Sequence, residues 1–256
     1  MLRSVKHVFG YRLQTVDQQS LGKVHDFMFD DAHWTVRYLV ADTRKWLAGR
    51  RVLISPLALG APDWGTRELA VHLTPQQIEQ SPPVSADEPV SRQREQELVK
   101  YYGWPMYWGI GAGVVGGVPA TARAVAKAED EAGLAEGREE RGDPHLRSVR
   151  EVTGYAIAAT DGEIGHVEDF IVDDQAWVMR YLVVDTRNWI PASRKVLVAP
   201  GWIKQVDWRE RRVVLVLDRE QIKNSPEYRP GEPINRAYEV KLYDFYGRPV
   251  YWKETE

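Results

Sequence analysis

Three carboxylates close to residue 30 are the first side chains whose type and spacing suit a chemical role. Asp26, Asp30 and Asp31 lie in one short stretch, and grouped oxygen ligands suit a hard cation such as calcium. An EF-hand loop, however, alternates its ligands around a central glycine, and that pattern is missing here. Because Asp commonly accepts hydrogen bonds from the backbone amides of a turn, we predict turn-forming carboxylates, with no metal and no cofactor.

Two arginines lie inside apolar runs that are predicted strands. Arg37 lies within residues 36–41, and Arg180 lies within residues 178–184. An unpaired charge in such a strand is costly, so we predict structural ion pairs. The candidate partners are Asp42 or Asp26 for Arg37, and Asp185 or Asp169 for Arg180. Anion binding is the alternative, and ion pairing is favoured because no glycine-rich phosphate loop accompanies either arginine.

The sequence contains one pattern twice, at a shift of about 144 residues. Residues 30–46 recur as residues 173–189, and the three carboxylates recur as Asp169, Asp173 and Asp174. No histidine keeps its place in both copies, since His166 stands opposite Lys23, and the chain has no cysteine. A histidine base, a thiolate nucleophile or a metal cage common to both copies is therefore not expected. We predict that the protein is not an enzyme.

Tryptophan and tyrosine residues recur at matching positions near predicted turns and strand ends. Exposed indole and phenol rings are typical anchors of protein interfaces. The alternative is that the rings pack inside each copy, and of the two this packing is favoured. The candidates for an interface with a partner or between the two copies are Trp34, Trp46, Trp64, Tyr107, Trp108, Trp177, Trp189, Trp208, Tyr251 and Trp252.

The composition restricts the class of protein further. Charged residues make up 28% of the chain, and their near balance leaves a formal net charge of −3. A basic surface of the kind that binds nucleic acid is therefore not expected. The glycine-rich apolar stretch at residues 109–120 is too short for a membrane-spanning helix. We expect a cytoplasmic protein without a transmembrane segment, and leave peripheral association with a membrane complex open.

The repeat divides the chain into three parts. Residues 1–108 and 145–256 are predicted domains, and residues 109–144, rich in Gly, Ala and charge, are a predicted linker. Short alternating runs such as residues 23–29 and 36–41 predict strands of a small antiparallel barrel. Capping signals then predict short helices that begin after Thr74 and Asp218, and longer helices over residues 91–102 and 235–246.

The first copy resembles a PRC-barrel domain in Leu2-Arg-Ser-Val, Gly22-Lys-Val-His-Asp-Phe27, Trp34-Thr-Val-Arg-Tyr-Leu-Val40 and Val52-Leu-Ile-Ser-Pro56. The second copy is similar through residues 161–170 and 180–185. The resemblance implies a mainly β fold with two tandem six-stranded antiparallel barrels, each followed by short helices. This family includes the cytoplasmic domain of the photosynthetic reaction-centre H subunit and a domain of ribosome maturation factors. It brings no catalytic motif.

These observations predict a non-catalytic protein-interaction or scaffolding protein with an unknown protein partner. Such a role suits a chain that duplicates its turns, caps and aromatic rings but no reactive group. We expect the two barrels to pack as an intramolecular pseudo-dimer, as a homodimer would. Two alternatives stay open: an H-subunit-like accessory factor in photosynthetic or membrane electron transfer, and an accessory factor in ribosome maturation.

Overall fold

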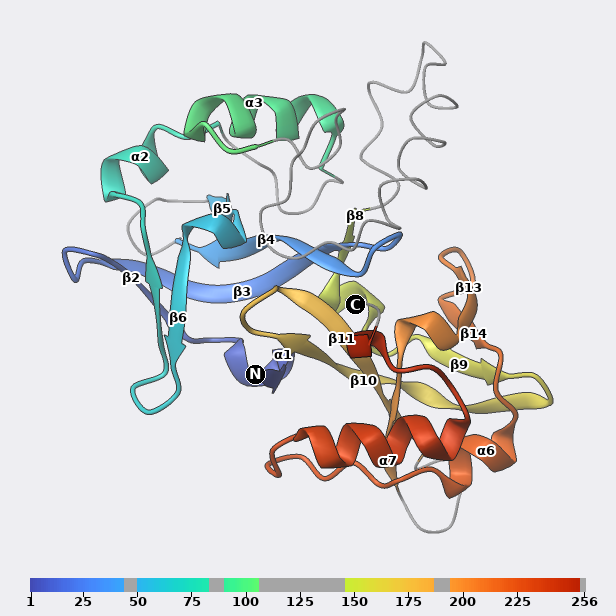
Figure 1. The fold of residues 1–256 in the computed structure, drawn as a ribbon. Helices are drawn as coiled ribbons and strands as arrows, with labels where there is room; N and C mark the ends of the chain where they lie inside the picture. The colour runs from blue at the N-terminus through green and yellow to red at the C-terminus, as the bar shows by residue number, and fades with distance from the viewer. Residues whose placement is uncertain (44–49, 83–89, 106–145, 187–193, 254–256) are drawn as a thin grey trace. The chain divides into compact units, whose positions relative to one another are not determined.

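A computed structural model describes residues 1–43, 50–82, 90–105, 146–186 and 194–253 (Figure 1). These residues form two compact units. Unit 1 comprises Met1–Phe9, Phe29–Val36 and Arg147–Lys253, and unit 2 comprises Gly10–Met28 and the described part of Arg37–Leu146. The units depart from the repeat boundary, because residues 1–9 and 29–36 of the first copy group with the second copy. The predicted linker, residues 109–144, lies outside the described residues.

Unit 2 is built on the strands of the first copy. They are β2 (Arg12–Thr15), β3 (Ser20–Asp30), β4 (Thr35–Asp42), β5 (Arg51–Ile54), β6 (Leu59–Asp63) and β7 (Glu68–Val71). The last two residues of β3 and the first two of β4 belong to unit 1. Their order in the sheet is β6-β7-β2-β3-β4-β5, with β2 and β7 parallel. The pairs β2–β3, β4–β5 and β6–β7 are antiparallel. A hydrophobic cluster that includes Tyr38, Leu53 and Leu98 fills the core of this unit.

Unit 1 repeats the same strand order. Its strands are β1 (Leu2–Ser4), β8 (Leu146–Ser148), β9 (Ala156–Ala159), β10 (Gly162–Asp173), β11 (Val178–Asp185), β12 (Lys195–Val198), β13 (Ile203–Asp207) and β14 (Arg212–Leu215). The order is β13-β14-β9-β10-β11-β12, and β1 adds to β10. The mainly β prediction is therefore confirmed. Among the described strands, no backbone pairing joins β12 to β13 or β5 to β6. Neither six-strand order is therefore closed into a barrel by backbone hydrogen bonds.

The helices begin and end at the residues that the capping signals predict. They are α2 (Pro75–Glu79), α3 (Arg92–Tyr102), α6 (Arg219–Asn224) and α7 (Arg236–Tyr246). Thr74 and Asp218 each form a capping box with the glutamine three residues on. Gly103 and Gly247 end α3 and α7 in the left-handed region, with φ of 70° and 60°. The predicted helices are confirmed.

Two short helices and three 3₁₀ turns were not predicted. Helices α1 (Val5–Val8) and α5 (Val149–Val152) follow β1 and β8 directly, and the turns are η1 (Pro56–Ala58), η2 (Pro200–Trp202) and η3 (Tyr251–Lys253). Ser4 and Ser148 are the N-caps of α1 and α5. The signal was available in the sequence, since both copies carry Leu-Arg-Ser-Val with a serine at the cap position.

Glycine is required where strands β10 and β11 come closest. A Cβ atom on Gly165 would lie 2.2 Å from the Asp185 carbonyl oxygen, well inside van der Waals contact. Gly22 occupies the matching place in the first copy, where a Cβ atom would lie 2.0 Å from the Asp42 carbonyl oxygen. Both copies therefore keep the long bent strand close to its neighbour by omitting a side chain.

Candidate functional site

The most distinctive feature of unit 1 is that residues 1–9, here called the N-terminal segment, bind to strand β10. Strand β1 runs antiparallel to β10, with Leu2 opposite Asp173 and Ser4 opposite Ile171. Strand β9 pairs with residues 162–166 of β10, and β11 pairs with the opposite edge. Strand β1 therefore continues the edge that β9 leaves. We call residues 168–173 of β10 the docking edge.

Apolar burial accounts for part of the attachment of the segment. Val5 and Val8 of α1 are 1% and 2% exposed, so both side chains are fully buried. Complete burial of a side chain of this size stabilises the folded state by roughly 2 kcal/mol. The guanidinium of Arg150 on α5 lies 4.7 Å from the centre of the Phe9 ring. The segment is thus part of the core and not a strand laid on the surface.

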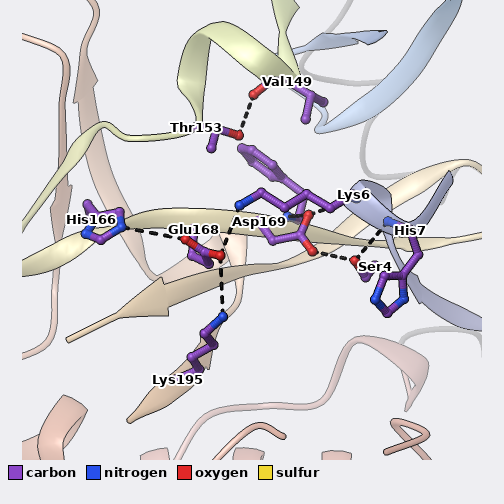
Figure 2. A network of polar contacts seen from close by, with 10 residues as sticks. Ser4, Lys6, His7, Val149, Thr153, His166, Glu168, Asp169 and Lys195 are labelled. Atoms are coloured by element: carbon purple, nitrogen blue, oxygen red, sulfur yellow. Dashed lines mark hydrogen bonds and ion pairs between the residues drawn. The ribbon is translucent and has the colours of Figure 1, made fainter. Parts of the chain in front are cut away.

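Asp169 holds the segment from inside the docking edge (Figure 2). Its buried carboxylate accepts hydrogen bonds from the Ser4 hydroxyl, from the Lys6 amide at 3.1 Å and from the Phe170 amide at 2.7 Å. Burial raises the pKa of the Asp169 carboxyl, and these hydrogen bonds oppose the rise. Ser4 also accepts a hydrogen bond from the His7 amide, so one serine caps α1 and binds Asp169.

Glu168 carries a second, more exposed network next to Asp169 (Figure 2). Its carboxylate lies 3.0 Å from the Lys6 ammonium, 3.4 Å from the Lys195 ammonium and 3.7 Å from His166 Nε2. Burial alone would raise the pKa of Glu168, but the hydrogen bond and charge of Lys6, helped by Lys195, lower it below its ordinary value. The pairing register with β11 shifts at this point, and such a bulge re-aims a side chain.

His166, Glu168 and Asp185 are the one group in the described part of the chain with the spacing of metal ligands. Their nearest ligand atoms all lie within 4.8 Å of one another. Two ammonium groups already lie beside Glu168, and they supply the positive charge that a cation would bring. Lys23 stands at the His166 position in the first copy. We therefore assign His166 and Glu168 to the ion-pair network of the docking edge.

The turn carboxylates behave as predicted. Asp30 accepts hydrogen bonds from the amides of Ala32 at 2.8 Å and His33 at 3.1 Å, and Asp173 accepts one from the Gln175 amide at 3.1 Å. The turn prediction for Asp30 and Asp173 is confirmed.

The neighbouring acidic residues of these turns form ion pairs within unit 1. Asp174 binds the N-terminal ammonium group of Met1 and lies 3.7 Å from Arg3. Asp31 pairs with Arg147 at 3.1 Å. These acidic residues therefore hold the chain's own segments, the N-terminal segment among them.

The predicted ion pair of Arg180 with Asp185 or Asp169 is wrong. The Arg180 guanidinium lies 3.9 Å from Asp173 and 4.3 Å from the centre of the Tyr251 ring. Asp185 is five residues further along β11, and successive side chains of a strand alternate between its faces. Arg37 and Asp42 on β4 stand at the matching positions of the first copy, and their pairing stays a prediction.

The recurring rings at the turns after β3 and β10 pack inside unit 1. Trp34 and Trp177 both adopt the left-handed region, with φ of 56° and 53°. Trp34 stacks on Phe29 with ring centres 5.3 Å apart. The Val36 amide donates to the Trp177 carbonyl at 2.8 Å, and the Met179 amide donates to the Trp34 carbonyl at 2.7 Å. The two turns thus exchange matching backbone hydrogen bonds.

The other described rings also have aromatic or cationic neighbours. The Trp64 ring centre lies 5.8 Å from that of Tyr11, and Arg147 lies 4.2 Å from the Trp208 ring centre. Tyr251 and Trp252 pack against Tyr243 of α7. Trp46, Tyr107, Trp108 and Trp189 lie outside the described residues. These contacts agree with packing inside each copy, and partner binding by the rings stays a prediction.

A buried glutamate on each of the two longer helices was not predicted from the sequence. Glu95 of α3 and Glu239 of α7 are 0% and 3% exposed. Glu239 accepts hydrogen bonds from the hydroxyls of Tyr181 at 2.7 Å and Tyr251 at 2.9 Å, and pairs with Arg236 at 2.9 Å.

These contacts attach α7 to β11 and to the C-terminal turn η3. Burial is the main cause that raises the pKa of Tyr251 to about 12, so its hydroxyl stays protonated and can donate. The missed signal is a carboxylate that stands three and four residues before apolar helix positions in both copies.

Comparison with known proteins assigns the family. The PRC-barrel domain matches residues 3–59 and 144–222, more than half of the chain. No curated protein matches the chain. Among the described helices, none has the length and apolar character that crossing a bilayer requires. One match begins near the start of each sequence repeat, and the chain belongs to the PRC-barrel domain family.

Proposed function

We propose that the protein is a non-catalytic interaction scaffold that binds an extended peptide segment along the docking edge of β10. The observation that carries this proposal is the attachment of residues 1–9, which add a strand to the edge and bury two valines. Strand addition is a recurring mode of peptide recognition, in which main-chain hydrogen bonds supply affinity and side-chain pockets supply specificity.

The contacts define which segment suits the edge. Asp169 selects a hydroxyl at the Ser4 position, and Glu168 selects a basic side chain at the Lys6 position. The buried site of Val5 lies between them and requires an apolar residue. The expected ligand is therefore an extended segment with a small hydroxyl residue, an apolar residue and a basic residue in sequence.

The state of the two carboxylates supports a binding role over a catalytic one. Asp169 receives three hydrogen-bond donors, and Glu168 lies between two ammonium groups. A general base needs a lone pair that is directed at a substrate. In the described site, these contacts direct both carboxylates at the chain's own side chains and amides.

We further propose that the six-strand order of each unit closes as a barrel of the PRC type, with β12 beside β13 and β5 beside β6. Family membership and the identical strand order of the two units support this closure. The pseudo-dimer, the cytoplasmic location, the electron-transfer role and the ribosome-maturation role stay predictions.

Binding of a peptide with the sequence of residues 1–9 tests the scaffold function. The site is occupied by the tethered segment, so the full chain carrying Val5→Asp, which weakens that segment and leaves β10 intact, should bind the peptide several-fold more tightly than the unchanged chain. Fluorescence polarisation of the labelled peptide measures this.

A matched control peptide carries Ser4→Ala and Lys6→Glu and should bind more weakly to the same variant. Circular dichroism of the Val5→Asp chain verifies that it is folded. The scaffold function would be contradicted if a folded Val5→Asp chain gave the same polarisation change with both peptides and neither titration reached saturation.

A further inference from the structure

We infer that the docking edge also takes the N-terminal segment of a second copy of this chain, so that two chains exchange segments reciprocally. This inference rests on the proposed scaffold function and names the partner for the same site.

The bound segment comes from the other repeat. Strand β10 belongs to the second repeat, yet the strand in register with its residues 171–173 is β1 of the first, and Ser4 binds a carboxylate 165 residues away in sequence. The second repeat has its own version of the segment, because Leu146-Arg-Ser-Val149 is identical to Leu2-Arg-Ser-Val5. The docking edge is therefore completed by a segment that arrives from a distant part of the sequence.

We place the hinge for this exchange at Gly10, directly after the segment. Phe9 is the last residue of this part of unit 1, and Gly10 is the first residue of unit 2. Gly10 has a φ of +78°, and a Cβ atom there would meet nothing within 4 Å. Since glycine adopts either sign of φ without a steric penalty, the backbone can change direction here while α1 and β1 stay intact.

The contacts that hold the segment do not depend on which chain supplies it. The strand register, the Ser4–Asp169 hydrogen bond and the Lys6–Glu168 ion pair all lie between residues 1–9 and strand β10. A reciprocal exchange keeps every one of them and loses only the high effective concentration of the tether. Exchange of an identical element is accordingly a low-cost route to a dimer, favoured by high protein concentration.

Engineered cysteines test the exchange in the full chain, which has none of its own. Leu2 and Asp173 are cross-strand partners, and the Cα spacing of such partners suits a disulfide. Chains carrying Leu2→Cys and chains carrying Asp173→Cys, with different affinity tags, are unfolded together, refolded at high concentration and oxidised. We expect a disulfide-linked product of two chains that carries both tags.

A matched pair measures random collision between chains. It replaces Leu2→Cys by Asp17→Cys, a solvent-exposed position in unit 2, and should give several-fold less of the two-tag product. Equal yields from the two pairs overturn the exchange. If Leu2→Cys or Asp173→Cys prevents folding, as judged by circular dichroism, Arg3→Cys with Val172→Cys provides a second pair in register.

Two further readouts separate this inference from the scaffold function. A chain that carries Leu2→Cys and Asp173→Cys together should form its disulfide within one chain at low concentration, which supports the docking itself. Peptide binding to the Val5→Asp chain without a two-tag product overturns the exchange between chains and leaves the scaffold function standing.

Discussion

At the residue scale, the pKa values of two neighbouring carboxylates of β10 shift in opposite directions. Glu168 is stabilised as an anion by Lys6 and Lys195, whereas Asp169 is buried and accepts hydrogen bonds from Ser4 and two amides. The pKa of Glu168 is accordingly lowered and the pKa of Asp169 is raised. Their contributions to stability must therefore change with pH in opposite directions.

Acid titration of stability checks this difference. A carboxyl group whose pKa is lower in the folded protein than in the unfolded chain stabilises the fold above its unfolded pKa, which is about 4.3 for Glu. This stability is lost as the pH falls through the folded-state pKa. Glu168→Gln should cost about 1 kcal/mol at neutral pH and should flatten the fall in unfolding free energy between about pH 5 and pH 3. Urea unfolding at a series of pH values measures both effects.

Asp169→Asn is the control of opposite sign. A raised folded-state pKa means that the folded protein takes up a proton before the unfolded chain does, which adds stability as the pH falls toward the unfolded value. Removing that carboxyl should steepen the acid decline. Parallel curves for Glu168→Gln and Asp169→Asn would rule out the opposed roles.

At the element scale, the close approach of β10 to β11 depends on a glycine. Long strands of this kind bend where their register shifts, and β10 shifts against β11 after Val167 and against β9 after Glu163. Gly165 lies between these shifts, in contact with the Asp185 carbonyl. A side chain at this place would force the strands apart at the point where β10 turns toward the docking edge.

Gly165→Ala should destabilise unit 1 by about 3 kcal/mol, since overpacking of this severity lies at the upper end of the usual range. Gly201→Ala is the matched control, because a Cβ atom on Gly201 would meet nothing within 4 Å; its effect should stay within about 0.5 kcal/mol. Thermal or urea unfolding of both variants gives the comparison. A Gly165→Ala chain as stable as the Gly201→Ala chain would refute the close approach.

At the scale of the whole molecule, the described chain forms two compact units whose boundaries differ from those of the repeat. Each unit contains one complete six-strand order, and each is accompanied by a capped long helix, α3 or α7. Both helices carry a buried glutamate, and Glu239 attaches α7 through Tyr181 and Tyr251. The units are thus built alike although the segments that complete unit 1 come from both repeats.

Barrel closure can be checked by amide hydrogen exchange of the full chain. If β12 lies beside β13, the outward amides of β13 should exchange slowly, at rates close to those of β14, because both edges of the strand are then paired. An open edge would leave alternate amides of β13 exposed and fast to exchange. Fast alternate amides in both β13 and β6 would contradict closure.

Much of the fold follows from local signals in the sequence. The strands follow from alternation, the helices from their capping residues, and the turns from Asp30 and Asp173, because each of these depends on residues only a few positions apart. The partner of Arg180 was missed because it depends on the pairing register of β10 with β11, which places Asp173 and not Asp169 beside Arg180. Glu239 was missed because its burial depends on how α7 packs on β11.

The sequence by itself determined the duplication, the PRC-type pattern, the caps and the turns. Only the tertiary structure decided which copy of Leu-Arg-Ser-Val fills the edge of β10, and which carboxylates become buried with it. The physical reason is that the two copies of the segment are identical over these residues, so they offer the same local contacts. The choice between them is made by chain connectivity and by long-range packing, which no short stretch of sequence encodes.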